Sequence, residues 1–374
     1  MWQPQSFYNQ YVLRTPVILT GEGAVRGLYN YPSAKVAVIH GSNFSDNEMF
    51  EDTFSKKKIC FFKRSWQGEP DFEGLQGTIR ELEEFQPDTI IAVGGGSVID
   101  GSKLCRLLYE FPYFDIRESR ISGNLFKTRF IAIPTTIGSG AEVSSAAVFV
   151  NHDNYSKDMI VMHELQPEVV VYDKRYVENM SAFLLFTSAL DAAAHMIEGY
   201  VSTIDNSFID IMAEKGMAIL HEELVKLFTN RCDVNYEQLQ YAGYLGGVVQ
   251  NHCIVGAAHA VAHQLTDRGY SHGEAVALLL PAVIMLNAEN DSVKVKYDRV
   301  AHVAGFSSLE DLVYFIRRAC EVSGIDKRKM PLKKLLIELS RDEEFCANIR
   351  NDKGGKGNPI EITDEYIVKL AEML

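Results

Sequence analysis

The sequence of 374 residues lacks the features of secreted, membrane and disulfide-bonded proteins. Its six cysteines are scattered without a CxxC pair, which fits reduced thiols better than a disulfide framework. The longest apolar run, from Ala275 to Leu286, contains Pro281 and is shorter than the ~20 residues that span a bilayer. The N-terminal residues MWQPQSFYNQYVL lack a basic segment followed by an apolar stretch, so we expect no secretion. We therefore expect a cytoplasmic protein with no membrane partner.

An excess of positive charge is also missing. The formal net charge is -13 at pH 7, so the long-range field of the protein repels phosphate backbones and anionic lipids. We expect no nucleic-acid partner. With 47% hydrophobic and 23% charged residues the chain has the composition of an ordinary globular protein, and its length fits two domains better than one.

The two halves of the chain have different sequence patterns. In the first half, short β-branched runs alternate with helical patterns such as Phe72 to Phe85, and this alternation predicts a parallel sheet covered on both faces. The strand candidates are residues 36–39, 59–62, 89–93 and 130–133. From about Ser181 long helical patterns follow, at residues 183–202, 208–228, 236–265, 275–287 and 309–323. The sequence predicts an α/β domain over residues 1–178 and an all-α domain over residues 179–374.

A glycine-rich turn follows the strand candidate at residues 89–93. Glycines let the backbone approach a diphosphate, and the free N–H groups of the helix that begins near Val98 would point at it. A tight turn from strand to helix also needs glycine for steric reasons alone. Asp100 and Lys103, on the following helix, either contact a cofactor or cap and solvate the helix. The turn consists of Gly94, Gly95, Gly96 and Ser97.

A second loop of small residues begins at Pro134, directly after the next strand candidate. The hydroxyls of Thr135, Thr136 and Ser139 can bond to phosphate, ribose or adenine, or can serve as ordinary caps of the following segment. Ligands of open α/β sheets bind beyond the carboxyl ends of the strands. Two such loops in one sheet therefore favour a nucleotide.

Residues of the metal-ligand type stand at helical spacing in the second half. Asp191 and His195 form one i, i+4 pair, His259 and His263 form another, and His272 follows. Each pair lies on one face of a helix and can present two side chains at one point. A carboxylate with two or three imidazoles suits Fe(II) or Zn(II), and the ligand types do not choose between them. Any one histidine alone could be a core or surface residue. Together they predict one divalent metal site.

Five segments resemble, in order, the motifs of the iron-containing (group III) alcohol dehydrogenases of the dehydroquinate synthase-like superfamily. The resemblance extends from Gly21 to Pro359 and covers nearly the whole chain. The segments are GGGSVIDGSK (94–103), PTTIGSGAEVS (134–144), DAAAHMIEGY (191–200), GAAHAVAHQL (256–265) and HGEAVALLLP (272–281).

The resemblance implies an N-terminal dinucleotide-binding domain, a helical C-terminal domain, and a cleft between them for NAD or NADP and one divalent metal, Fe²⁺ or Zn²⁺. It implies a homodimer as well. Many relatives that prefer NAD have an aspartate after the first strand, which repels the 2′-phosphate of NADP. This chain has Gly41 there, so NADP is also a possible cofactor. His263 would be a proton-relay residue. The implied metal ligands are Asp191, His195, His259 and His272, and the implied cofactor contacts are Gly41, Gly94, Gly95, Gly96, Ser97, Asp100, Thr135, Thr136 and Ser139.

The implied activity is reversible hydride transfer between a primary or secondary alcohol and nicotinamide, with the metal polarising the alcohol oxygen. Three alternatives stay open. The first is a lyase resembling dehydroquinate synthase, although basic residues are almost absent from the metal segments, with Arg268 the exception. The second is a metal-stabilised binding protein. The third is a specialised oxidase or dehydrogenase of an acidic sugar, resembling the 3-deoxy-manno-octulosonate 8-oxidase branch. Arg268 and Gly41 are compatible with an anionic substrate of this kind.

Overall fold

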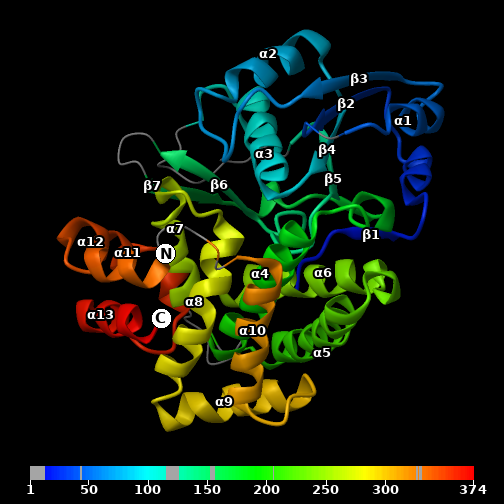
Figure 1. Cartoon of the computed structure of the whole chain (residues 1–374). Coiled ribbons are helices and arrows are strands. Elements are labelled where there is room, and N and C mark those ends of the chain that lie inside the picture. The colour runs from blue at the N-terminus through cyan, green and yellow to red at the C-terminus, as the bar shows by residue number, and fades with distance from the viewer. Residues whose placement is uncertain are drawn as a thin grey trace, which may run out of the picture.

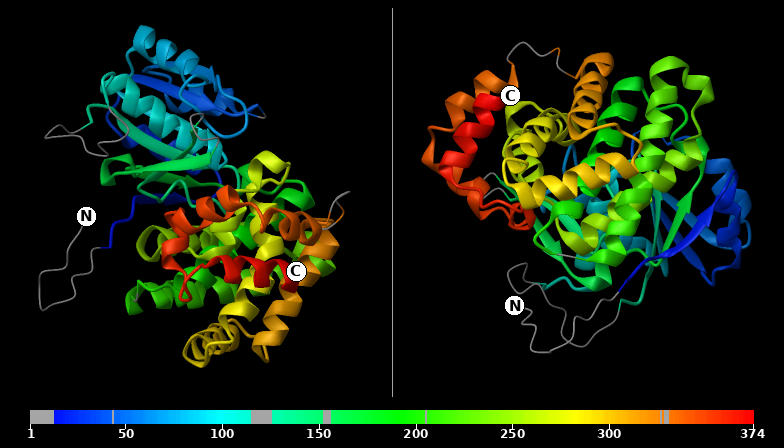
Figure 2. Two further views of the ribbon diagram at one scale, coloured as in Figure 1. Left: turned by 90° about the vertical axis from the view of Figure 1, so that its left-hand side faces the viewer. Right: turned by 90° about the horizontal axis from the view of Figure 1, so that it is seen from below.

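The computed structural model describes residues 13–42, 44–114, 126–151, 156–204, 206–325, 327 and 331–374. Strands alternate with helices in the first half of the described chain, whereas the second half is helical. The two halves lie against each other in Figures 1 and 2. The change falls between Tyr172, which ends the last strand, and Ala182, which begins helix α4. Among the residues listed above, no helix is both long enough and apolar enough to cross a lipid bilayer.

The first half is built on a sheet of six strands in the order β1-β8-β5-β4-β2-β3, and every neighbouring pair is parallel. This confirms the parallel sheet that the sequence predicts. Each of the predicted strands lies within an observed strand that is longer by one or two residues. The strands are β1 (Val17–Thr20), β2 (Lys35–His40), β3 (Lys58–Lys63), β4 (Thr89–Gly94), β5 (Arg129–Pro134) and β8 (Val169–Tyr172).

Both faces of this sheet are buried. Because successive side chains of a strand point to opposite faces, each strand contributes to two hydrophobic clusters. Ile91 and Val93 of β4 belong to a cluster with Phe50, on the side of helix α1 (Asn47–Thr53). Ile90 and Ala92 belong to a larger cluster that includes helices α2 (Gln76–Phe85) and α3 (Gly96–Glu110) and continues into the helical half. One continuous core therefore joins the sheet to the helices.

A two-stranded antiparallel hairpin, β6 (Ala146–Asn151) and β7 (Ser156–Val161), lies outside this sheet and packs through β6 on α3. The strands of this hairpin are not among the strand candidates of the sequence. Of the two roles that the sequence leaves open for Lys103, solvation of the helix does not apply, because its side chain is fully buried. Its Nζ donates to Asp100 Oδ1 at 3.1 Å and to the carbonyl oxygen of Ala146 at 2.6 Å. Asp100 Oδ2 accepts the N–H of Val148 at 3.2 Å, so this ion pair fixes the hairpin to α3.

Helices make up the second half, and α4 packs against α5, α6, α8, α9 and α10. This confirms the predicted helical C-terminal region. The helices are α4 (Ala182–Val201), α5 (Ser207–Thr229), α6 (Tyr236–Cys253), α7 (Ala257–His263), α8 (His272–Asn287), α9 (Asp291–Val303), α10 (Leu309–Ser323), α11 (Leu332–Leu339), α12 (Glu343–Asn351) and α13 (Asp364–Met373).

Two helix predictions need correction. The single helix predicted over residues 236–265 is wrong, because Ile254 has a φ of 59° and the chain turns before α7 begins. The helix predicted from residue 275 begins earlier, at His272, because Ser271 and Glu274 form a reciprocal capping box. As a result, His259 and His272 both lie in the first turn of a helix, where the chain has just changed direction.

Candidate active site

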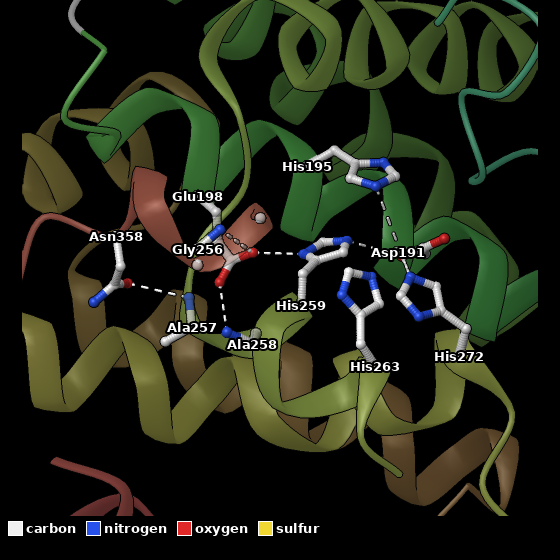
Figure 3. A network of polar contacts seen from close by, with 12 residues as sticks. Asp191, His195, Glu198, Gly256, Ala257, Ala258, His259, His263, His272 and Asn358 are labelled. Carbon is white, nitrogen blue, oxygen red and sulfur yellow. Dashed lines mark hydrogen bonds and ion pairs between the residues drawn. The ribbon is translucent and has the colours of Figure 1, made fainter. Parts of the chain in front are cut away.

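Three helices bring four ligand-type side chains to one point (Figure 3). The Oδ1 atom of Asp191 on α4 lies 4.0 Å from Nε2 of His195, one turn further along the same helix. It lies 3.4 Å from Nε2 of His259 on α7 and 3.7 Å from Nε2 of His272 on α8. The structure therefore places together all four residues that the resemblance implies as metal ligands.

These four residues fit a divalent cation. Ligands about 2.1 Å from a common ion in a tetrahedral arrangement lie about 3.4 Å from one another, which is close to the spacing found here. Asp191 Oδ1 and His259 Nε2 are both buried, and neither has a hydrogen-bond partner among the residues that the structure describes. Buried polar atoms are almost always satisfied, so two such atoms facing each other point to a missing partner that binds both. Asp191, His195 and His259 offer atoms that all lie within 4.8 Å of one another.

The electrostatics of the cluster agree with this fit. Burial by itself would raise the pKa of Asp191, but the imidazoles of His195, His272 and His259 outweigh it and lower that pKa. Burial lowers the pKa of His195 to about 4 and that of His272 well below its usual value, so both rings are neutral near pH 7. Burial would also lower the pKa of His259, but the carboxylates of Glu198 and Asp191 raise it to about 9, so this ring carries an extra proton near pH 7 that it has to release when it binds an ion. An ionised carboxylate with neutral imidazoles is the form that binds metals.

Two carboxylates that the sequence analysis does not single out hold the two histidines of α7. Glu198 Oε2 lies 2.5 Å from Nδ1 of His259, and Asp352 Oδ2 lies 2.8 Å from Nδ1 of His263. His263 stacks on His272, with ring centroids 5.3 Å apart and planes 14° apart, so it adjoins the four-residue cluster without joining it. Glu198 follows Asp191 by seven residues, a helical repeat that could have revealed it, whereas Asp352 has no such signal.

A cavity of about 440 Å³ runs from the cluster to the carboxyl edge of the sheet. One wall comes from the hairpin and includes Val148, Met159 and Val161. The opposite wall comes from the helices and includes Gln250 and Asn251 of α6, the four residues of the cluster, and His263. The cavity therefore brings the candidate metal centre and the carboxyl edge of the sheet into one space.

The predicted cofactor residues divide into two groups. Those that line the cavity are Gly96, Ser97, Asp100, Thr136 and Ser139. Gly41, Gly94, Gly95 and Thr135 are not among the lining residues and lie in the adjoining strand ends and turns.

Within the described residues the first turn of α3 has no acidic residue and no side-chain cap, and the N–H of Val98 donates to the carbonyl oxygen of Gly95 at 2.9 Å, so the N–H groups of Gly96 and Ser97 are the ones that could bind an anion. A Cβ atom at Gly96 would lie 2.8 Å from Cβ of Ser139, so a larger residue would close the approach between the two loops. The hydroxyl of Ser97 is already engaged, because it donates to the carbonyl oxygen of Gly68 and accepts from Arg64 Nη1 at 2.8 Å. Arg64 thus adds positive charge beside this helix end, a contribution that the sequence analysis missed.

The loop after β5 contacts helix α4 through backbone atoms. A Cβ atom on Gly138 would lie 1.9 Å from the carbonyl oxygen of Ser188, so only glycine fits there. Ser188 precedes Asp191 by three residues on α4. The loop after β5 and helix α4 therefore touch without an intervening side chain.

Arg268, which the sequence analysis places beside the metal segments, is exposed and does not line the cavity. Its guanidinium donates to the carbonyl oxygen of Gln264 at 2.9 Å and lies over the ring of Phe345. Arg268 therefore gives no support to the two alternatives that need a basic residue at the metal.

Comparisons with known proteins agree with this geometry. The chain matches the sequence model of "Iron-containing alcohol dehydrogenase" over residues 15–174 and that of "Fe-containing alcohol dehydrogenase family, C-terminal" over residues 185–374. It is 31% identical over 313 residues to an alcohol dehydrogenase of Thermococcus barophilus, covering 81% of both chains. It is 29% identical over 306 residues to an NADPH-dependent butanol dehydrogenase of Clostridium saccharobutylicum, covering 78% of this chain and 76% of that one. The structure of an iron-containing alcohol dehydrogenase from Thermococcus thioreducens superposes with a TM-score of 0.85 at 26% identity, covering 96% of this chain and 97% of that one.

Proposed function

The chain belongs to the iron-containing alcohol dehydrogenase family and is a metal-dependent, NAD(P)-linked alcohol dehydrogenase; from this premise we propose which of its residues carry the reaction. Asp191, His195, His259 and His272 hold the metal, and His263 is the catalytic residue that carries the substrate proton. The observation that carries the proposal is the convergence of three imidazole Nε2 atoms on one unpartnered carboxylate oxygen, at 3.4, 3.7 and 4.0 Å.

The cofactor's phosphates bind at the N-terminus of α3, to the backbone of Gly94, Gly95, Gly96 and Ser97. Thr135, Thr136 and Ser139 line the cofactor, and Asp100 and Gly41 lie beside it. What supports this placement is the uncapped first turn of α3 at the edge of the same cavity that reaches the metal cluster. The nicotinamide supplies the hydride chemistry and the metal polarises the alcohol oxygen. The residues of the chain align the two and exclude water.

His263 can move a proton at its Nε2 atom. Asp352 accepts a hydrogen bond from Nδ1 of His263 at 2.8 Å, and its other oxygen accepts the N–H groups of Gly354 and Gly355, at 2.8 and 3.2 Å. Because Asp352 is held in place as an acceptor, the ring proton stays on Nδ1 and the lone pair of Nε2 stays free. His263 is therefore suited to take the proton of an alcohol bound beside His272 and pass it outward.

We propose small aliphatic primary or secondary alcohols as substrates. Apolar side chains line much of the cavity near the cluster, including Met159, Val161, Ile254 and Val255. Its volume of about 440 Å³ also has to accept the nicotinamide, which leaves room for a small substrate only.

Metal removal and restoration test the proposed function. Protein stripped with a chelator should reduce neither NAD nor NADP with a panel of alcohols and diols, and addition of Fe(II) or Zn(II) should restore turnover. His259→Ala should lose metal and activity together, whereas His302→Ala, at an exposed position on α9, should change neither. Full turnover by the metal-free protein, or by His259→Ala, would contradict the assignment.

Assembly, boundary and location also remain proposals. We propose a homodimer because β1 is an edge strand whose Val17 and Ile18 are 54% and 38% exposed, and an exposed apolar edge favours pairing. We place the domain boundary at residues 178 and 179, between β8 and α4. A cytoplasmic location is supported by the six cysteines, all of which are free thiols. Light scattering of the purified protein, which measures the mass of the particle, would reveal a monomer.

A further inference from the structure

Glu198 connects α4 to α7 through a single carboxylate (Figure 3). Its side chain is 2% exposed. Its Oε2 atom accepts from Nδ1 of His259 at 2.5 Å and from the N–H of Gly256 at 3.0 Å, and its Oε1 atom accepts from the N–H of Ala258 at 2.7 Å. A residue of one metal-bearing helix therefore binds the first turn and the metal-binding side chain of the next.

These bonds set the position of α7. The helix has no side-chain cap of its own, and its first N–H groups go instead to Glu198 and to Asn358, which accepts from Ala257 at 3.2 Å. Asp191 and His195 are on α4, whereas His259 is on α7. The separation of the ligands across the two helices thus depends on where Glu198 holds the start of α7.

Glu198 also decides which ring nitrogen of His259 is free. A carboxylate accepts hydrogen bonds but cannot donate them, so when the ring loses a proton to bind an ion, its remaining hydrogen stays on Nδ1. Nε2 then carries the lone pair, and this is the atom that lies 3.4 Å from Asp191 Oδ1 without a hydrogen-bond partner. The outer partner of a metal-binding histidine fixes its tautomer and ring orientation in this way.

The second histidine of α7 offers a matched comparison. His263 lies one turn after His259, and Asp352 holds its Nδ1 while accepting two backbone N–H groups, just as Glu198 does for His259. The two buried carboxylates have the same kind of partners, yet only Glu198 holds a residue of the four-residue cluster. A variant of Asp352 therefore controls for the loss of a buried, hydrogen-bonded carboxylate near α7.

We propose that Glu198 is a positioning residue for the metal, which places His259 and fixes its ring so that the site binds the ion tightly. The inference rests on the proposed metal site. Removing the outer partner of a metal-binding histidine lowers metal affinity by about 10- to 100-fold. Glu198→Gln is a sharp test because its amide NH₂ can donate to Nδ1 and so favours the ring tautomer with hydrogen on Nε2, which cannot bind the ion.

The experiment measures Zn(II) affinity by competition with a chromophoric chelator, together with urea unfolding of the metal-free proteins. We expect Glu198→Gln to weaken Zn(II) binding by about 10- to 100-fold and Asp352→Asn to change it by less than about threefold. If Glu198 is only structural, Glu198→Gln will lower the stability of the metal-free protein and leave the affinity unchanged, which overturns the inference. Equal losses in both variants also overturn it.

A second variant covers the case in which Glu198→Gln does not fold. Glu198→Asp keeps the charge but shortens the side chain by one methylene, so it keeps the tautomer and shifts the position of His259. We expect an intermediate loss of Zn(II) affinity, and an affinity equal to that of the wild type overturns the inference. If the wild-type protein itself binds no Zn(II), the proposed metal site fails, and this outcome is distinct from failure of the role of Glu198.

Discussion

The Nζ atom of Lys353 lies 2.8 Å from Oδ1 of Asp158, although the two residues are 195 positions apart in the chain. Lys353 follows α12 in the helical half, and Asp158 is on strand β7 of the hairpin. Nζ also donates to the carbonyl oxygen of Met159 at 3.3 Å. Lys353 and Met159 both line the cavity, so this contact bridges its two walls.

Breaking this bridge should weaken cofactor binding slightly. The side chains of Lys353 and Asp158 are 63% and 38% exposed, and such a pair contributes at most about 1 kcal/mol. We expect Lys353→Met to raise the Kd of NADH or NADPH by up to about fivefold in dilute buffer, because the hairpin wall is then less ordered before binding. The difference should vanish in about 1 M salt, which screens the pair. Fluorescence titration with the reduced cofactor measures this Kd in both proteins at low and high salt.

Lys356→Met is the control for this effect. Lys356 is in the same loop, but its Nζ donates to the carbonyl oxygen of Arg350 and it does not line the cavity. A loss of affinity in Lys356→Met equal to that in Lys353→Met would show that the loop as a whole, rather than the bridge, is responsible.

Asp352→Asn should reduce turnover without removing the metal. An asparagine amide can donate to Nδ1 of His263 and moves the ring hydrogen to Nε2, the atom that has to accept the substrate proton. We expect kcat to fall by about 10²-fold, within the range of general acid–base contributions, while KM and metal content stay close to those of the wild type. His263→Ala should cause a similar loss, and the double variant should be no worse than the worse single one. Independent, multiplying losses would contradict a shared role.

Glu142 should make stability depend on pH. It is fully buried, its carboxyl accepts from the Tyr172 hydroxyl at 2.9 Å, and burial raises its pKa from 4.5 to about 7. A group whose pKa rises on folding stabilises the fold below its unfolded pKa, and that contribution is lost as the pH rises through the folded value. The free energy of unfolding of Glu142→Gln minus that of the wild type should therefore increase by about 1–3 kcal/mol when the pH is raised from 5 to 8.

Urea unfolding at the two pH values measures this gain. The same substitution at the exposed Glu164 should have an equal effect at both. A pH-independent effect of Glu142→Gln would mean that the carboxyl of Glu142 is ionised throughout this range.

Gly41→Asp should turn the enzyme away from NADP. A Cβ atom at Gly41 would lie 3.6 Å from Val98 Cγ2, an ordinary contact, so a side chain fits at this strand end. An acidic side chain there would accept from the adenosine ribose and repel a 2′-phosphate. We expect KM for NADPH to rise by roughly tenfold and KM for NADH to change little. A parallel change in both values would place Gly41 away from the ribose.

The strands of the sheet could be predicted because buried parallel strands appear as short β-branched runs; residues 89–93 of β4 are an example. The hairpin escaped prediction because what holds it is the buried pair of Lys103 and Asp100, and pairing between distant segments leaves no periodic signal. The helix expected over residues 236–265 was wrong because its apolar pattern continues through the turn at Ile254.

The metal cluster could be predicted from the sequence, because i, i+4 spacing marks Asp191 with His195 and the family motifs mark His259 and His272. The partners of these histidines were harder to find. Glu198 shares a helix face with Asp191 and could have been noticed, but Asp352 is 89 residues from His263 and only the fold brings them together. Arg268 shows the opposite error, because proximity in sequence to the histidines does not bring it to the cavity.

The backbone contact between Gly138 and Ser188 limits how this enzyme can be redesigned. With no side chain between the loop and α4, no substitution can shorten or lengthen a side chain there, and the backbone packing of the fold sets the spacing of the two elements. Libraries aimed at bulkier alcohols should leave that junction untouched. They should instead randomise the hairpin positions Val148, Met159 and Val161, which line the cavity.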